Sequence, residues 1–305
     1  RGWIAGSGIP ILGARACEVD LRALERLIAR NGFVDRVNAH VTYDGVLRVE
    51  VSQREPLLRL LVDGYDVYVT GRGYVFPAPR ASSVYVPVVT GGYRPPFPAG
   101  YGGDLAASLR KELERSEEAI AGMEREKYPF FRRERRNDEN IRALRRMTIR
   151  KGWFEADEKF DERVAALRRH KAELRRRYRY EEQCIEAGIQ AIVKRQEAER
   201  ARQKKLEKRY EDFWKLITFV KQIQEDDFWQ AEIVQIVAST APSGTLEVEL
   251  VPRSGDFVVR FGRLEQVAPK LDRLTTFYRE GFPRVGWDAW RIVDVRFDGR
   301  VVCSN

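Results

Sequence analysis

The chain has few of the residues on which metal sites, disulfide frameworks and histidine-dependent catalysis depend. Its 305 residues include three cysteines, Cys17, Cys184 and Cys303, which are far apart, and two histidines, His40 and His170. No CxxC pair and no Cys/His cluster occurs, so we expect neither a zinc site nor a bound cofactor. Both histidines are expected to be solvated or packed side chains rather than ligands or bases.

Sequence motifs that carry catalysis are missing as well. The chain has no Walker loop, no GxGxxG turn, no HExxH helix and no Ser/His/Asp arrangement. The carboxylates at the ends of expected strands, Asp226, Asp227 and Asp298, are typical of turns and helix caps rather than of an acid/base pair. The sequence therefore predicts a protein that is not an enzyme and has no small-molecule substrate.

No apolar run reaches the 18 residues that a transmembrane helix needs. The apolar stretch at 2–14 is too short, and glycines and a proline interrupt it. The chain begins at Arg1 rather than at a methionine, and we expect that an anchor or targeting segment has been removed.

The length of the chain and the distribution of its charge limit the possible domain architectures. A chain of 305 residues accommodates two domains, and a hydrophobic fraction of 43% is enough to build a packed core. Between Asp104 and Tyr210 there are 31 basic and 22 acidic residues, an excess of nine that equals the net charge of the whole chain. This segment is therefore compositionally distinct from the sequence on either side.

The basic segment has the composition of helices. Ala, Glu, Lys, Arg and Leu dominate it, and between Phe160 and Ile192 apolar residues recur about every three to four positions. We expect helices folded back as a hairpin or a short coiled coil. Pro129 and Gly152-Trp153 are the predicted breaks, and a separate last helix is expected from Ala198 to Gln224, with its apolar end docked on a sheet.

The sequence before the basic segment predicts a helix followed by strands. Asp20 is the expected N-cap of the helix, and Asp44-Gly45 is the expected turn of a hairpin between residues 34 and 51. Short strands are predicted between residues 57 and 89. Because proline cannot donate to a strand ladder, Pro56 marks a boundary between two parts.

The sequence after the basic segment predicts a hairpin, a helix and a last strand. Apolar and polar residues alternate from 245 to 250 and resume at Phe257, after a turn at 254–256. A helix from Gln266 to Tyr278 is expected to stop at Gly281. We predict one final strand over 292–302, with its outer edge unpaired.

These patterns predict the α+β class, as an antiparallel β domain with packed helices that a helical insertion interrupts. The predicted boundaries are residues 1–54, 55–103, 104–204 and 205–305, where 55–103 and 205–305 are the two halves of the β domain.

Several blocks of sequence, in order and at compatible spacing, resemble the FtsQ/DivIB family of bacterial cell-division proteins. They are VLRVEVSQREP (46–56), LLRLLVDGYDVYVTGRGYVFP (57–77), AEIVQIVAS (231–239), VELVPRSG (248–255), KLDRLTTFYREG (270–281), VGW (285–287) and VDVRFDGRVVC (293–303). The resemblance implies that residues 1–54 are a POTRA-like domain truncated at its start. The insertion at 104–204 has no counterpart in the family.

The resemblance also implies a function without catalysis. Members of the family are divisome scaffolds that span the inner membrane once, with most of the chain on the periplasmic side, and support septum assembly. They bind FtsB/FtsL-type partners by adding a partner strand to the last strand of the β domain. In this chain that strand corresponds to 292–302. Phe297 stands where the family has a tyrosine, so a hydrogen bond from that hydroxyl is lost.

The resemblance and the sequence patterns together predict the site residues. The partner-binding residues are Val293, Val295, Arg296, Phe297, Asp298, Val301 and Val302. Arg54 is expected to tie the two domains together by binding carbonyls or a carboxylate, and Pro56 to set the bend. The alternative for 292–302 is an internal strand or a protected edge, with Arg296 and Arg300 acting as charges that discourage pairing.

The basic insertion leaves a second function open, that of a membrane- or nucleic-acid-binding protein. Arginine runs such as Arg175-Arg176-Arg177, with Phe130, Phe131 and Trp153, resemble a phosphate-contact surface. Acidic residues are interleaved throughout, as on solvated helices, so nucleic acid is disfavoured. Anionic lipid is the more plausible of the two, a protein-binding arm is favoured over both, and a plain spacer is the simplest alternative.

Overall fold

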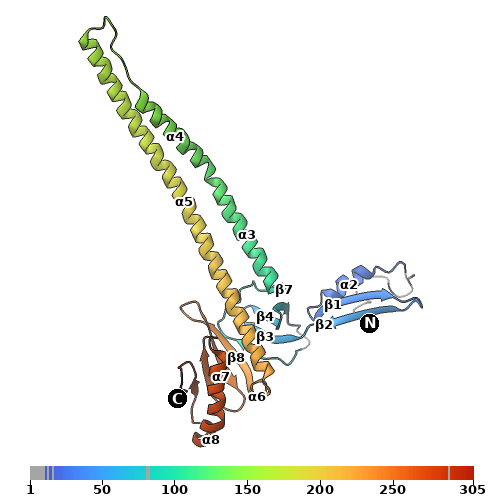
Figure 1. The fold of residues 1–305 in the computed structure, drawn as a ribbon. Helices are drawn as coiled ribbons and strands as arrows, with labels where there is room; N and C mark the ends of the chain where they lie inside the picture. Colours follow the sequence, from blue (N-terminus) through green and yellow to red (C-terminus); the bar gives the residue numbers. More distant parts are fainter. Residues whose placement is uncertain (1–10, 12–13, 16, 80–82, 288) are drawn as a thin grey trace. The chain divides into compact units, whose positions relative to one another are not determined.

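The computed structural model describes residues 11, 14–15, 17–79, 83–287 and 289–305 (Figure 1). It divides into two compact units, one formed by Arg1–Leu109 with Glu207–Asn305 and the other by Arg110–Leu206. The first unit contains both β-sheets, and the second contains most of the basic helical segment.

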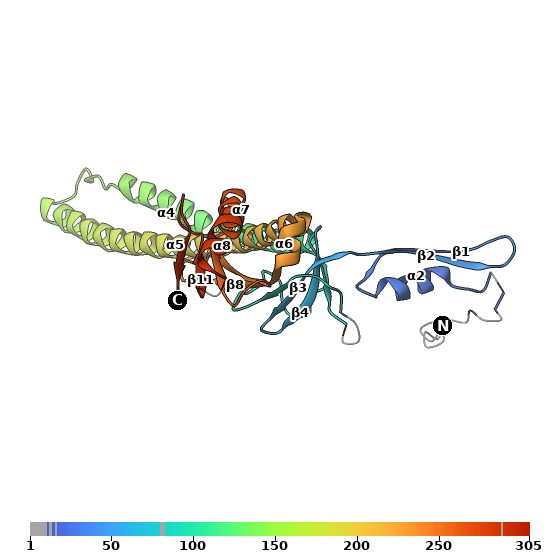
Figure 2. The ribbon, with the colours of Figure 1, turned by 90° about the horizontal axis from the view of Figure 1, so that it is seen from below.

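The first described elements of the first unit are a helix and a two-stranded sheet. The elements are α2 (Leu21–Ala29), β1 (Val34–Val41) and β2 (Leu47–Gln53). The Asp20 carboxylate accepts a hydrogen bond from the Ala23 N–H at 2.9 Å, as an N-cap should. Leu24 is fully buried, and α2 lies along one face of the β1–β2 ribbon (Figure 2). The expected helix cap and hairpin are therefore confirmed.

Among the described residues, the main sheet of the first unit has ten strands in the order β12-β11-β10-β9-β8-β6-β3-β4-β5-β7. Their bounds are β3 (Pro56–Val62), β4 (Tyr65–Thr70), β5 (Tyr74–Pro77), β6 (Val88–Thr90), β7 (Gly103–Asp104), β8 (Ile233–Thr240), β9 (Leu246–Pro252), β10 (Val258–Gly262), β11 (Ile292–Asp294) and β12 (Val302–Ser304). The α+β class is confirmed, since helices and a largely antiparallel sheet are segregated along the chain.

The expectation of a purely antiparallel sheet is wrong at three strand pairs. β6 runs parallel to both β3 and β8, and β11 runs parallel to β10. The β10–β11 pair is parallel because the intervening helices carry the chain back to the same end of the sheet. The β6–β8 pair joins strands that the whole helical segment separates, so hairpin patterns in the sequence do not specify its direction.

The crossover between β10 and β11 is one continuous helical segment. It consists of three elements, α7 (Val267–Thr276), η1 (Phe277–Gly281) and α8 (Phe282–Val285). The prediction that Gly281 stops this helix is wrong. Gly281 has helical backbone angles, and a Cβ there would lie 2.5 Å from the Phe277 ring, so the glycine makes room for packing. The helix ends at Gly286, whose φ is 91°.

The last part of α5 (Asp157–Glu225) supplies the core helix of the first unit. Phe213, Leu216 and Phe219 are buried there, and the rings of Phe219 and Phe261 on β10 are 4.9 Å apart. The expected docking of this apolar helix end on the sheet is therefore confirmed. The separate helix predicted from Ala198 is wrong, because no glycine or proline interrupts residues 189–225 and the helix runs through.

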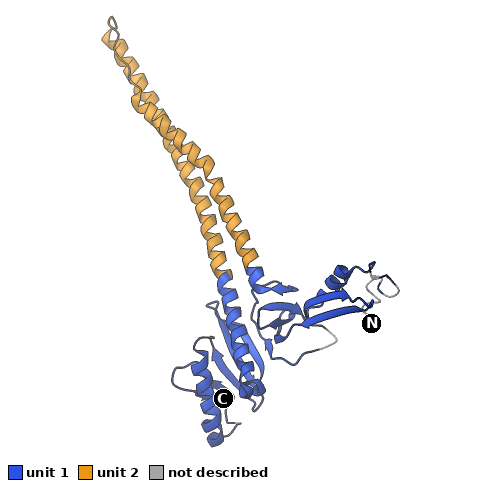
Figure 3. Cartoon of the chain, turned by 45° about the vertical axis from the view of Figure 1, so that its right-hand side comes forward, with its two compact units in different colours: residues 1–109, 207–305 blue, residues 110–206 orange. Residues whose placement is uncertain are grey.

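The second unit is an antiparallel helical hairpin (Figure 3). Helices α3 (Leu105–Glu126) and α4 (Tyr128–Arg146) run along one side, and α5 returns along the other. Polar contacts link the two sides, including the Ser116 hydroxyl with Glu199 at 2.7 Å and the Asn137 amide with the Tyr178 carbonyl at 3.0 Å. In the described part of the chain, no helix combines the length and apolarity that crossing a bilayer requires.

Candidate partner-binding edge

The predicted final strand over 292–302 is wrong, because the structure has two short strands there. β11 and β12 form an antiparallel hairpin, with Ile292 opposite Ser304 and Asp294 opposite Val302. Gly299, whose φ is 70°, lies in the turn between them. The Asp298-Gly299 dipeptide is a strong signal for such a turn, and it could have revealed the hairpin from the sequence.

This hairpin moves the free edge of the sheet from β11 to β12. β11 pairs with β10 on one side and with β12 on the other, so its backbone has no side left for a partner strand. Within the described residues, β12 is the outermost strand and pairs only with β11. Val302 and Ser304 are exposed, as expected at an edge. Cys303 and Ser304, which the sequence reading did not include, therefore belong to the candidate site.

The opposite end of the sheet is a poor place for strand addition. β7 consists of two residues, Gly103 and Asp104, and continues directly into α3. The Asp104 carboxylate caps this helix by accepting from the Ala107 N–H at 2.8 Å. Because a helix follows at once, β7 offers little extended backbone, and β12 is the better template of the two.

The predicted partner-binding residues separate into three groups. Val293 and Val295 are fully buried in the core and cannot touch a partner. Arg296, Phe297 and Asp298 lie in the connection between the two strands and are exposed. Val301 is half-buried just before β12, and Val302 begins the edge strand itself.

A buried carboxylate holds the start of the connecting turn. The Asp294 side chain is buried, and its two oxygens accept hydrogen bonds from the Arg296 backbone N–H at 3.0 Å and from the Arg296 guanidinium at 2.6–3.1 Å. Burial opposes ionisation, but the hydrogen bonds and charge of Arg296 outweigh it and lower the pKa of Asp294. The charge of Arg296 is therefore already engaged within the chain.

Two basic residues of α7 hold the strands next to the turn. The buried Lys270 ammonium donates to the carbonyls of Phe261 at 3.1 Å and Arg263 at 2.7 Å, and burial lowers its pKa. Arg273 donates to the Val295 carbonyl at 3.2 Å. These hydrogen bonds satisfy carbonyl groups at the ends of β10 and β11. Side chains of α7 therefore hold the strand ends from which the edge hairpin extends.

The exposed part of the turn presents one aromatic ring. Phe297 is 42% exposed, which leaves a large part of the ring available to a partner. The Arg300 guanidinium lies 5.4 Å from the centroid of this ring, within the range of a cation–π contact. An exposed apolar ring beside an edge strand can serve as the side-chain anchor for an added strand.

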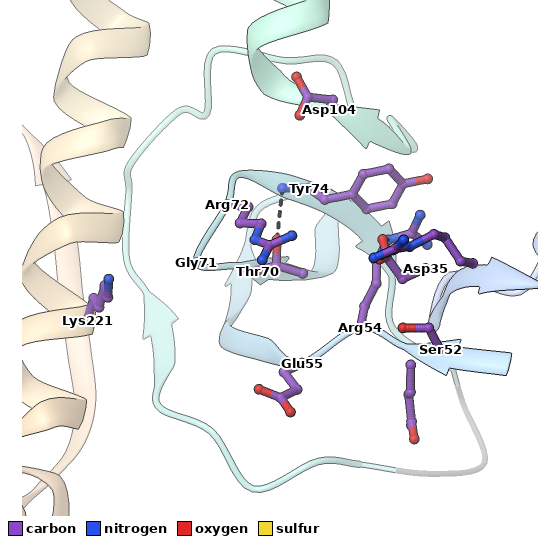
Figure 4. Close-up of a pocket in the computed structure, with 12 residues that line it drawn as sticks. Asp35, Ser52, Arg54, Glu55, Thr70, Gly71, Arg72, Tyr74, Asp104 and Lys221 are labelled. Carbon is purple, nitrogen blue, oxygen red and sulfur yellow. Dashed lines mark hydrogen bonds and ion pairs between the residues drawn. The ribbon is translucent and has the colours of Figure 1, made fainter.

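Arg54 lies at the junction between the two sheets, beside a pocket of about 580 Å³ (Figure 4). Its guanidinium donates to the carbonyls of Gly32 and Val34, and its Nε lies 3.4 Å from the Asp35 carboxylate. It also stacks on the Tyr74 ring, at 3.6 Å from the ring centroid. Arg54 thus binds residues of both sheets.

Pro56 is the first residue of β3, directly after the junction, and lies opposite Thr70. The lining of the pocket mixes both signs of charge, with Arg36 and Arg72 facing the same space as Glu55 and Asp104. Among the described residues, no group of three or more His, Cys, Asp or Glu side chains is placed to hold a metal ion.

Comparison with known proteins matches part of this chain to one family. The family model described as "FtsQ/DivIB, C-terminal related" matches residues 193–304. This range begins within α5 and includes β8 to β12, so it contains the edge hairpin and its supporting helix α7. A search among curated proteins finds no match. The C-terminal part is thus related to the FtsQ/DivIB C-terminal domain, which suggests a cell-division-related protein and a domain type that is typically non-catalytic.

Proposed function

We propose that this chain is a non-catalytic divisome scaffold that captures an extended segment of an FtsB/FtsL-type partner along β12. The observation that carries the proposal is the position of β12 as the outermost strand, inside the region related to the FtsQ/DivIB C-terminal domain. The proposal includes a single-pass anchor in the inner membrane and a periplasmic location for the two units. Both of these rest on the family resemblance.

Strand addition is the physical basis of the proposed binding. An edge strand presents N–H and C=O groups that a second extended chain satisfies, so affinity comes from backbone hydrogen bonds. β12 has three residues, which is too short a ladder to select one partner by itself. Specificity therefore requires side chains, and Phe297 with Val302 are the exposed apolar groups at this edge.

The experiment measures binding of a purified FtsB–FtsL pair to the whole chain and to two variants. Phe297→Glu places a charge on the proposed anchor and is expected to weaken binding by at least tenfold, because a desolvated aromatic anchor is typically worth ~2 kcal/mol. Tyr43→Glu is the matched control, since Tyr43 is fully exposed in the turn between β1 and β2. It introduces the same charge far from β12 in sequence.

A backbone test complements the side-chain test. Cys303→Pro removes one N–H from β12 and is expected to reduce binding. Equal affinity of the parent chain and Phe297→Glu, or failure of the pair to bind the parent chain, would refute the proposal. Circular dichroism of each variant distinguishes loss of the site from loss of the fold.

A further inference from the structure

The loop that joins α4 to α5, residues 147–156, carries two aromatic side chains that the hairpin does not bury. Trp153 and Phe154 are 94% and 96% exposed. The free energy of leaving two such rings in water is unfavourable, and adjacent fully exposed aromatics are rare on a surface with no binding role. Met147 in the same loop is also exposed, so apolar side chains gather at this one end of the hairpin.

The charge around these rings has one sign. Residues 145–154 include four Lys/Arg and no Asp/Glu, although acidic residues are interleaved with basic ones in the rest of the hairpin. Among the described residues, no acidic side chain pairs with Arg145, Arg146 or Arg150, whereas Lys151 forms an ion pair with the first residue of α5. Among the described residues, three exposed guanidinium groups without an ion-pair partner therefore lie close to the exposed rings in the sequence.

Hydrogen bonds define the conformation of the loop that carries the rings of Trp153 and Phe154. The Glu155 carboxylate accepts from the Gly152 N–H at 2.9 Å and from the Arg163 guanidinium at 2.5 Å. The bond from Gly152, followed by that from Arg163, lowers the pKa of Glu155. The nearest acidic charge is thus used to close the turn that presents Trp153 and Phe154.

We propose that residues 145–154, here called the arm tip, bind the surface of a lipid bilayer that contains anionic headgroups. Trp153 and Phe154 enter the interfacial region, where aromatic rings are favoured, and the three free arginines contact lipid phosphates. Each basic residue near an anionic surface strengthens binding by roughly fivefold. The site is outside residues 193–304 and does not depend on the strand-addition proposal.

The small size of the arm tip favours a bilayer over a protein or a nucleic acid. A specific protein interface buries about 800 Å² on each partner, which ten residues at the end of two helices do not supply. Phosphates of a nucleic acid would be better matched by a groove or a long basic face, but the remainder of the hairpin alternates in sign. A lipid surface requires no complementary pocket. Two inserted aromatic rings and the basic residues next to them each make the free energy of binding to it more favourable.

The experiment measures sedimentation of the whole chain with two kinds of vesicle, pure phosphatidylcholine and equal parts of phosphatidylcholine and phosphatidylglycerol. We expect binding to the anionic vesicles, weakened by added salt, and little binding to the neutral ones. Trp153→Ser/Phe154→Ser should reduce the partition coefficient more than tenfold. Tyr180→Ser, on an exposed aromatic in the middle of α5, is the matched control and should bind as the parent chain does.

A second pair of variants isolates the charge. Arg145→Gln/Arg150→Gln should weaken binding at least tenfold. Lys204→Gln/Lys205→Gln removes the same charge from an exposed part of α5 near the other end of the hairpin and should change binding by less than about threefold. The proposal is overturned if anionic vesicles fail to sediment the parent chain, or if the arm-tip variants bind vesicles as well as the controls.

Two further outcomes would assign the arm tip to another macromolecule and also overturn the proposal. In the first, the parent chain binds a single-stranded oligonucleotide, the Trp153→Ser/Phe154→Ser chain does not, and neither chain binds vesicles. In the second, the same difference is seen with a purified protein partner instead of the oligonucleotide. Phe297→Glu should leave vesicle binding unchanged, so failure of this proposal is distinguishable from failure of the proposed function.

Discussion

The Arg296 guanidinium lies 2.6 Å from the buried Asp294 carboxylate, and the two residues together begin the turn that leads to the edge strand. Arg296 was expected to contact a partner, but its charge is satisfied within its own chain. Its aliphatic part crosses Gly262 at the end of β10. The pair therefore positions β12 and Phe297.

Asp294→Asn should destabilise the chain by about 2 kcal/mol at pH 7, because it weakens charged hydrogen bonds in a buried position. The folded-state pKa of Asp294 is below its ordinary value of 3.8, so this stabilisation is present above that value and is lost as the pH falls through the folded pKa. Denaturant unfolding at pH 7 and pH 3 should show a smaller difference between variant and parent at pH 3. Asp298→Asn, in the exposed turn, is the control, and an unchanged difference across pH would contradict the assignment.

Gly262→Ala should destabilise the chain more than Gly299→Ala does. The two glycines have similar left-handed backbones, with φ of 72° and 70°, so each alanine costs about 1 kcal/mol in conformation alone. At Gly262 the new Cβ would also lie 2.7 Å from Arg296, whereas the space around Gly299 is open. Thermal unfolding of both variants checks this, and equal losses would show that Arg296 moves aside freely.

Gly188→Ala and Gly122→Ala should have opposite effects on the helical hairpin. Alanine favours a helix over glycine by about 1 kcal/mol, and Gly122 has open space, so Gly122→Ala should be stabilising. A Cβ at Gly188 would lie 2.2 Å from the Phe130 ring on α4, so Gly188→Ala should separate the helices and lower stability. Helix melting followed at 222 nm distinguishes the two, and stabilisation by both substitutions would argue against this packing.

Arg54→Ala should loosen the connection between the two sheets of the first unit. It removes hydrogen bonds to two carbonyls and the stacking on Tyr74, so amide hydrogen exchange should rise across residues 33–35 and 74–77. Arg54→Lys should restore the connection only partly, because an ammonium group does not stack on an aromatic ring or form paired hydrogen bonds as a guanidinium does. Arg48→Ala on the exposed face of β2 is the control, and equal exchange in the Arg54 and Arg48 variants would exclude this role.

Elements defined by local signals were predictable from the sequence. The Asp20 cap, the Asp44-Gly45 turn and the strand alternation after Leu246 each depend on neighbours within a few residues, and each was confirmed. The helical composition of the basic segment was likewise sufficient to expect a hairpin. The prediction of a stop at Gly281 failed because its lack of a side chain serves the Phe277 ring rather than the end of a helix.

The candidate site was less predictable, because an edge is a property of the whole sheet. The sequence by itself determined where most helices and strands lie and the α+β class, since hydrophobic period and turn chemistry are local. Only the tertiary structure decided that β6 joins the two halves, that β11 is internal and that β12 is outermost. Strands of three residues have little preference of their own, and the neighbours that pair with them, brought together from distant parts of the chain, select their place.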